Sequence, residues 1–169
     1  MRRADIVTST RHAGNVRRYH TWPTLRGQTV AEHSWQMMIL FKELFPDAWC
    51  LEVAEYIMYH DVGEIGTGDV PFPLKARYPA LKAVMDEIEA DVTDNMGVVW
   101  PELTPRQRTL IKVCDLLEMW CWGREEMLMG NQYARPIVDD TRAAIFKLTA
   151  AEPGTMHHDV LTWMDARRV

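Results

Sequence analysis

The stretch from Thr104 to Trp122 constrains the fold more than any other part of the chain, because it is apolar on nearly every side of a helix. It opens with Pro105 directly after a threonine, an arrangement typical of the first turn of a helix. A helix without a polar face has to be covered by other elements. The sequence therefore predicts a buried helix over 104–122, with a single aspartate, Asp115, in its middle.

The segments available to cover that helix are also helical in pattern. Thr29 and Glu32 form the T-x-x-E pattern of a capping box, and the apolar run that follows predicts a helix from about 30 to 45. Apolar residues at helical spacing predict four more helices, at 49–59, 78–96, 139–150 and 157–167. No segment sustains the period-two alternation of a half-buried strand. The predicted fold class is therefore all-α, a single helical bundle, with Trp35, Trp120 and Trp122 assigned to packing.

Glycines and prolines concentrate in one place. Residues 63–73 contain Gly63, Gly66, Gly68, Pro71 and Pro73. Such a density of residues that break regular structure favours neither a helix nor a central strand. The sequence predicts a long ordered loop here.

The overall composition is that of an ordinary globular protein. The 169 residues are 47% hydrophobic and 25% charged, with a net charge of -5, so residues 1–169 are expected to form one domain. No stretch approaches the roughly 18 apolar residues of a membrane span, and the basic N-terminus lacks the apolar core of a signal peptide. Three cysteines are too few for a disulfide framework. We expect a cytoplasmic protein that binds neither membrane nor nucleic acid.

Positive charge gathers at the N-terminus. Six arginines fall within the first 26 residues, against the single acid Asp5. An acidic protein with one basic segment can still bind a small phosphorylated molecule. Residues 1–28 are therefore expected to contribute to a substrate pocket.

Four polar residues occupy positions that an apolar core disfavours. A carboxylate buried at Asp115 needs an arginine, backbone amides or a metal ion as its partner. His60 and Asp61 are adjacent at the end of an apolar helix, and His33 lies in the first turn of another. Two imidazoles and two carboxylates suit a borderline divalent ion such as Zn, Co, Mn or Fe. A single residue of this kind is usually a satisfied structural group, and it is their combination that indicates a metal site.

The same four residues carry a resemblance. Their order, H then HD then D on separate helices, resembles the HD-domain phosphohydrolase superfamily. Residues 60–75 further resemble the H-D-x-x-E-x-x-x-G-D-x-P-x-x-x-K block of the 5′-deoxynucleotidases within it, and Arg18 stands 15 residues before His33, as in that group. The resemblance runs from Arg18 to Asp115 and implies the all-α HD fold.

A second subgroup is also similar. Residues 18–23 (RYHTWP) and 28–35 (QTVAEHSW) resemble small phage-type HD proteins, which include the dATP triphosphohydrolases of phages that replace adenine with 2-aminoadenine. In the monophosphatases a tryptophan follows the arginine that matches Arg18, whereas here that residue is Tyr19. This departure disfavours a simple transfer of monophosphate specificity.

The resemblance implies roles for individual residues. A divalent ion, with Co, Zn or Mn expected and Mg possible, would be held by His33, His60, Asp61 and Asp115. It would act as a Lewis acid and activate water for in-line hydrolysis. The roles implied for the remaining residues are catalytic for Glu64 and Asp69, phosphate binding for Arg18 and Lys75, and sugar or base contact for Tyr19, Thr21, Trp22 and Pro73. From the residues alone, Glu64 could instead cap a helix and Asp69 could belong to an Asx-turn.

The expected activity is cleavage of the 5′-phosphate ester of a deoxynucleotide. A dATP or dNTP triphosphohydrolase, which yields deoxyadenosine and tripolyphosphate from dATP, is favoured over a 5′-deoxynucleotidase that acts on a dNMP. A non-catalytic nucleotide sensor is the outside alternative, and the intact pair Glu64 and Asp69 argues against it. The resemblance also implies a homo-oligomer, a dimer or hexamer, in the host cytoplasm if the chain is viral.

Overall fold

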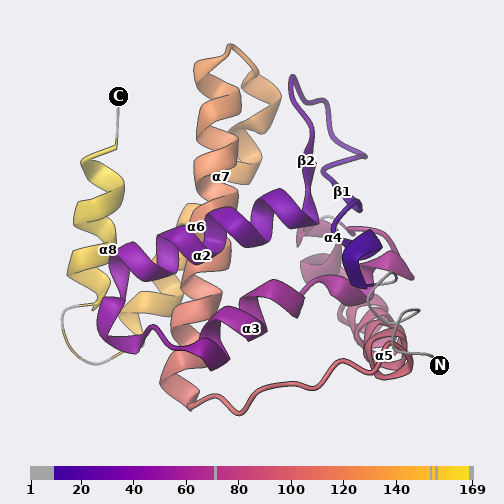
Figure 1. The fold of residues 1–169 in the computed structure, drawn as a ribbon. Coiled ribbons are helices and arrows are strands. Elements are labelled where there is room, and N and C mark those ends of the chain that lie inside the picture. Colours follow the sequence, from indigo (N-terminus) through magenta and orange to yellow (C-terminus); the bar gives the residue numbers. More distant parts are fainter. Residues whose placement is uncertain (1–9, 71, 153, 155, 168–169) are drawn as a thin grey trace.

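The computed structural model describes residues 10–70, 72–152, 154 and 156–167, and most of these are helical (Figure 1). The side chains of residues 72, 73 and 76 are outside the described part. The elements in chain order are β1 (Arg17–Arg18), β2 (Gln28–Thr29), α2 (Val30–Leu44), η1 (Pro46–Ala48), α3 (Leu51–Tyr59), η2 (Val62–Ile65), α4 (Phe72–Arg77), α5 (Pro79–Asn95), α6 (Pro105–Leu128), η3 (Gln132–Ala134), α7 (Arg135–Ala150) and α8 (Met156–Asp165), where η marks a 3₁₀ helix. The all-α prediction is confirmed.

Helix α6 is the buried helix expected from its apolar pattern. Thr104 caps it, accepting a hydrogen bond from the backbone N–H of Gln107, and Pro105 is its first residue. In Figure 1 α6 and α7 stand side by side, while α2 and α3 cross them and α8 closes one side. The main core joins residues of α2, α3, α6, α7 and α8, among them Phe41, Ile57, Leu117, Ile145 and Val160, each fully buried.

Helices α6 and α7 are both longer than predicted. Helix α6 continues to Leu128 rather than ending near Trp122, and α7 begins at Arg135 rather than at Asp139. The glycine at 123 does not end the helix. A Cβ atom at Gly123 would lie 3.0 Å from Val138 Cγ2, so the missing side chain lets α7 approach α6 closely.

The glycine-rich stretch is partly helical, so its prediction as a loop was wrong at both ends. Residues Val62–Ile65 form the 3₁₀ helix η2, and α4 begins at Phe72. A Cβ atom at Gly63 would lie 2.8 Å from Cβ and from the carbonyl oxygen of Glu89. A glycine is therefore needed at this position because η2 contacts α5 closely, and not because regular structure has to end there.

A short antiparallel pair, β1 with β2, was not expected. Arg17 pairs with Thr29 and Arg18 with Gln28. Strands of two residues are too short to leave an alternating pattern in the sequence. Thr29 then caps α2 through the predicted capping box, because its backbone N–H donates to Glu32 at 2.7 Å and Glu32 N–H donates back at 3.3 Å. The pair thus joins Arg18 directly to the start of α2.

Two further expectations concern the surface. Trp120 and Trp122 are buried as predicted, but Trp35 on α2 is 61% exposed, so its assignment to packing was wrong. Among the residues that the structure describes, no helix has the length and apolar character needed to cross a membrane.

Candidate metal centre

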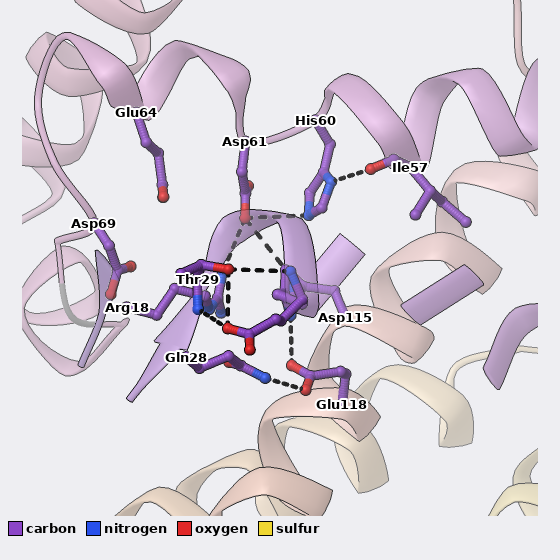
Figure 2. A network of polar contacts seen from close by, with 12 residues as sticks. Arg18, Gln28, Thr29, Ile57, His60, Asp61, Glu64, Asp69, Asp115 and Glu118 are labelled. Carbon is purple, nitrogen blue, oxygen red and sulfur yellow. Dashed lines mark hydrogen bonds and ion pairs between the residues drawn. The ribbon is translucent and has the colours of Figure 1, made fainter. Parts of the chain in front are cut away.

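Three helices bring the four predicted metal ligands together. His33 comes from the first turn of α2, His60 and Asp61 from the end of α3, and Asp115 from the middle of α6. One ligand atom each of His33, His60 and Asp115 lies within 4.8 Å of the other two. Asp61 Oδ2 lies 3.3 Å from His60 Nε2 and 3.7 Å from His33 Nε2. Figure 2 shows His60 and Asp61 pointing toward Asp115.

Both imidazoles are oriented to offer the same nitrogen. His60 Nδ1 donates to the carbonyl oxygen of Ile57 at 2.7 Å, and His33 Nδ1 is hydrogen-bonded to the carboxylate of Glu118. Within the described part of the chain, the two buried Nε2 atoms have no hydrogen-bond partner. An imidazole held through Nδ1 with a free Nε2 is the state that ligates metals. The donor set therefore fits a divalent ion held by two nitrogens and carboxylate oxygens.

Glu118 is a functional residue that sequence reasoning missed. It is 1% exposed and accepts a 2.6 Å hydrogen bond from Gln28 Nε2 while its other oxygen bonds His33. The sequence did contain a signal, because Glu118 follows Asp115 by three residues and so lies on the same face of an apolar helix. A carboxylate behind a ligating histidine fixes its tautomer and makes it a stronger ligand.

Charges around the centre keep both aspartates ionised. Burial would raise the pKa of Asp115, but Lys112, 2.6 Å from Oδ2, and His33 hold it well below the usual range. Burial opposes ionisation of Asp61 as well, and the charges of His60 and Arg18 outweigh it and lower the pKa of that carboxyl. Arg18 donates to Asp61 Oδ2 at 2.9 Å. The two carboxylates are thus ready to bind a cation.

The same charges act on His33. Burial and the charge of Arg18 oppose a proton on its ring, yet Glu118 and Asp115 favour it more and raise the pKa of His33 to about 9. A proton and a divalent ion compete for the same nitrogen, Nε2. Metal binding at this centre is therefore coupled to release of a proton.

Glu64 has a different environment from the aspartates. It is 4% exposed, its Oε1 lies 3.7 Å from Lys75 Nζ, and its Oε2 has no hydrogen-bond partner among the described residues. Burial, together with the negative charges of Asp61 and Asp69, raises the pKa of Glu64 to about 8. A carboxyl group that titrates near neutral pH is suited to give and take a proton during a reaction.

Asp69 holds the chain next to Arg18. Its Oδ2 accepts a 2.9 Å hydrogen bond from the backbone N–H of Tyr19. Tyr19 has a φ of 57°, in the left-handed region that non-glycine residues rarely adopt, and its ring stacks on Trp122 at 3.8 Å with an angle of 11°. Such strain persists only where surrounding contacts enforce it, and it is concentrated at functional sites. Asp69 therefore has an observed positioning contact, and its catalytic role stays a prediction.

One cavity lies beside the centre. Its lining comprises Arg18, Tyr19, Trp22, Asp61, Glu64, Asp69, Val70, Lys75, Lys112, Asp115, Met119, Ile137, Asp140 and Thr141. Three cationic side chains therefore line it together with the candidate ligands Asp61 and Asp115. The sequence analysis identified two of these cations, Arg18 and Lys75, and missed Lys112. Thr21 is exposed and is not part of this lining, so its predicted contact with substrate is not supported. The side chain of Pro73 lies outside the described residues.

Comparisons with known proteins agree with this geometry. A sequence model of the YfbR-like 5′-deoxynucleotidases matches residues 8–157. The chain is 31% identical over 111 residues to a dATP triphosphohydrolase of cyanophage S-2L, with 63% of this chain and 62% of that protein covered. It is also 31% identical over 126 residues to a dATP triphosphohydrolase of Salmonella phage PMBT28, with 65% and 61% covered. The chain thus spans about three fifths of the length of these two relatives.

A solved structure shares the fold. The HD phosphohydrolase DatZ of cyanophage S-2L, bound to dA and one catalytic Zn²⁺ ion, superposes with a TM-score of 0.75 over 94% of both chains at 21% identity. The arrangement of helices is therefore that of an HD phosphohydrolase.

Proposed function

The chain belongs to the YfbR-like 5′-deoxynucleotidase family, and on that premise we propose that it is a metal-dependent phosphohydrolase that cleaves dATP, or dNTPs more broadly, into a deoxynucleoside and tripolyphosphate. One observation carries the proposal. The free Nε2 atoms of His33 and His60 converge with Asp61 and Asp115 beside a cavity that also contains cations and the proton-carrying Glu64. The two phage relatives are named for this activity.

The four convergent residues would hold the ion. Co, Zn or Mn suits two imidazoles and two carboxylates, with Mg possible, and the related DatZ contains Zn²⁺. When bound, a divalent ion polarises a phosphate and lowers the pKa of a water molecule. The chain's own part is to hold both imidazoles through Nδ1, by Ile57 and Glu118, so that Nε2 faces the centre, and to keep both aspartates ionised.

The remaining polar residues would serve the in-line displacement at the α-phosphorus. Arg18 and Lys75 neutralise charge on the nonbridging oxygens, because a guanidinium fork and an ammonium group both bind phosphate. Glu64, with its raised pKa, holds a proton at neutral pH and can give it to the 5′-oxygen as the ester bond breaks. Asp69 orients Arg18 through the backbone of Tyr19 and supports the attacking water as the second carboxylate.

The deoxyribose would lie against Tyr19 and Trp22. Both line the cavity, and Tyr19 is held rigidly by Asp69 and by its stack on Trp122. A rigid wall on the 2′ side rejects a ribose whose hydroxyl would clash or lose its hydrogen bonds. Pro73 remains a candidate for the face of the base, and Thr21 is the least supported of the proposed contacts because it is exposed.

The triphosphate is favoured over the monophosphate because of a third cation. Lys112 lines the cavity with its side chain 54% exposed, in addition to Arg18 and Lys75. Its ammonium group, which pairs with Asp115 at 2.6 Å, adds a third positive charge to the cavity, and more positive charge suits a longer, more negative phosphate chain. The second candidate is a 5′-deoxynucleotidase that releases orthophosphate from a dNMP, and the match to the family model favours it. The buried Glu64 argues against a sensor without catalysis.

Three wider proposals accompany the activity. Residues 1–169 form one HD domain. The free thiols of Cys50, Cys114 and Cys121 fit the reducing cytoplasm, that of the host if the protein is viral. Self-association into a dimer or hexamer is supported by exposed apolar side chains such as Trp35 (61%) and Ile39 (41%), one turn apart on α2, and light scattering after gel filtration would test it.

The activity is tested with metal-depleted protein. Each dNMP and dNTP is incubated with Co, Mn, Zn or Mg added in turn, and orthophosphate, pyrophosphate and tripolyphosphate are separated by chromatography. Metal-dependent tripolyphosphate from dATP supports the proposal. Orthophosphate from dNMPs with intact dNTPs would assign the protein to the deoxynucleotidases, and no product from any substrate would refute both. An Asp115→Asn protein is the control for contaminating phosphatases.

A further inference from the structure

A buried carboxylate far from the metal centre fastens the loop that carries Tyr19 and Trp22. Glu126 is fully buried on α6, 11 residues beyond Asp115, which corresponds to about 16 Å along the helix. At that distance it touches neither the ion ligands nor the phosphate-binding cations. Its function has to be sought in what it binds.

Glu126 binds the backbone of the loop directly. Its Oε2 accepts from the N–H of Leu25 at 2.7 Å, and its Oε1 accepts from the N–H of Arg26 at 3.1 Å. Asn131, in the turn after α6, completes the contact, since its Nδ2 donates to Glu126 Oε2 at 2.7 Å and to the carbonyl oxygen of Pro23 at 2.8 Å. Three hydrogen bonds, at Pro23, Leu25 and Arg26, thus hold the main chain from 23 to 26.

The fastened segment adjoins the wall of the cavity. Pro23 follows Trp22, whose indole N–H donates to the carbonyl oxygen of Tyr133 at 2.8 Å and whose backbone N–H donates to Tyr19 O at 2.9 Å. Tyr19 stacks on Trp122, one turn before Glu126 on the same helix. The position of Trp22 relative to Tyr19 therefore depends on how the loop is held against α6.

Stability alone does not require this arrangement. A buried carboxylate surrounded by donors is costly to desolvate, and apolar side chains can stabilise a loop without it. Hydrogen bonds to successive backbone amides do something that apolar contact does not, because they fix the register of the loop within a bond length. Such precision matters where a wall has to exclude one hydroxyl group.

We propose that Glu126, together with Asn131, is a positioning pair that sets the discrimination between 2′-deoxyribose and ribose by holding Trp22 against the cavity. The inference rests on the proposed function. A glutamine at 126 offers one acceptor where the carboxylate offers two, so one of the two backbone N–H groups loses its partner and the loop loosens.

The test compares Glu126→Gln with Glu125→Gln. Glu125 is the matched control, because it is 55% exposed and pairs with the side chain of Arg26 without binding the loop backbone. We expect the ratio of kcat/KM for dATP to that for ATP to fall about tenfold or more in Glu126→Gln and to stay unchanged in Glu125→Gln. A merely structural role would reduce the active fraction and lower both rates equally, leaving the ratio as it is. An unchanged ratio in folded, active Glu126→Gln overturns the proposal.

Further measurements distinguish the ways in which the test could fail. Exchange of the Leu25 and Arg26 amide protons should accelerate in Glu126→Gln while metal affinity stays that of the wild type. If Glu126→Gln does not fold, Asn131→Ala, which frees the Pro23 carbonyl, should lower the same ratio, and an unchanged ratio there overturns the proposal as well. If the wild type hydrolyses neither nucleotide, the proposed function fails. The positioning role is then decided by the ratio of deoxyadenosine to adenosine binding in calorimetry of the metal-loaded proteins.

Discussion

Replacing Glu118 by glutamine should weaken metal binding while leaving every ligand in place. Glutamine is nearly the same size, and its oxygen can still accept from His33 Nδ1. Gln28 can adapt, because its Oε1 has no hydrogen-bond partner in the described structure and can turn to accept from the new amide. What is lost is the negative charge behind the imidazole. Loss of such a partner typically costs 10- to 100-fold in metal affinity, or about 1.4–2.7 kcal/mol.

The pH dependence makes this prediction specific. With a pKa of about 9, His33 of the wild type is protonated below that pH in the metal-free protein. Each ion then displaces one proton, so between pH 7.5 and 8.5 the wild-type binding constant should rise about eightfold. Without the charge of Glu118, burial and Arg18 lower the pKa of His33, so a proton competes less with the metal ion. The binding constant of Glu118→Gln should therefore rise less between the two pH values. The deficit of Glu118→Gln therefore grows as the pH increases.

The assay is a titration of Zn²⁺ against a chelator of known affinity at pH 7.5 and 8.5. Glu125→Gln, an exposed charge change on the same helix, should bind like the wild type at both values. If folded Glu118→Gln bound Zn²⁺ within twofold of the wild type at pH 8.5, with the same rise between the two values, the assigned role of Glu118 would be refuted.

Four other variants probe the centre and its frame. Asp115→Asn should abolish stoichiometric metal binding and lower kcat at least about 100-fold, measured by elemental analysis and product release; a fully active, metal-loaded variant would contradict the ligand assignment. In the metal-free protein the pKa of Glu64 is raised from 4.5 to about 8, so between these two pH values folding takes up a proton. The free energy of unfolding should therefore fall by about 1.4 kcal/mol for each unit by which the pH rises within this range. Urea unfolding at pH 5.5 and 7.5 should show this loss of stability in the wild type and not in Glu64→Gln. An identical loss in both proteins would contradict the raised pKa of Glu64. Gly63→Ala should lower the free energy of unfolding by roughly 1–3 kcal/mol, because the new Cβ atom would lie 2.8 Å from Glu89. Gly68→Ala has open space around the new Cβ atom and should lose about 1–2 kcal/mol, from its φ of +73° alone. Thermal unfolding that found Gly63→Ala as stable as the wild type would exclude the predicted clash.

The candidate metal ligands could be picked out from the sequence because they differ in polarity from their surroundings. Histidine and aspartate stand out inside apolar helical patterns, and the HD spacing indicated that they belong together. Glu118 obeys the same logic but is not part of that motif. It was missed because its partner, His33, is 85 residues away along the chain. A hydrogen bond between helices leaves no local pattern.

Part of the cavity lining could not be predicted either, again because it depends on contacts between helices. Met119, Ile137 and Asp140 belong to α6 and α7, whose mutual register depends on the close packing at Gly123. The prediction that Thr21 contacts substrate is left without support by a feature of the nearby backbone. The left-handed backbone at Tyr19 and the turn that its carbonyl accepts from Trp22 leave Thr21 exposed while Tyr19 and Trp22 line the cavity.

Helix α6 links the reaction centre to the substrate wall through one face. Asp115, Glu118, Trp122 and Glu126 are spaced by three, four and four residues, so they share a stripe along the helix. In this order they are a candidate metal ligand, the hydrogen-bond partner of the candidate ligand His33, the ring on which Tyr19 stacks, and the residue that binds the loop. A rotation or shift of α6 would therefore move the ion and the wall together. Because α2, α3 and α7 pack against α6, the helix keeps the parts of the site at fixed distances.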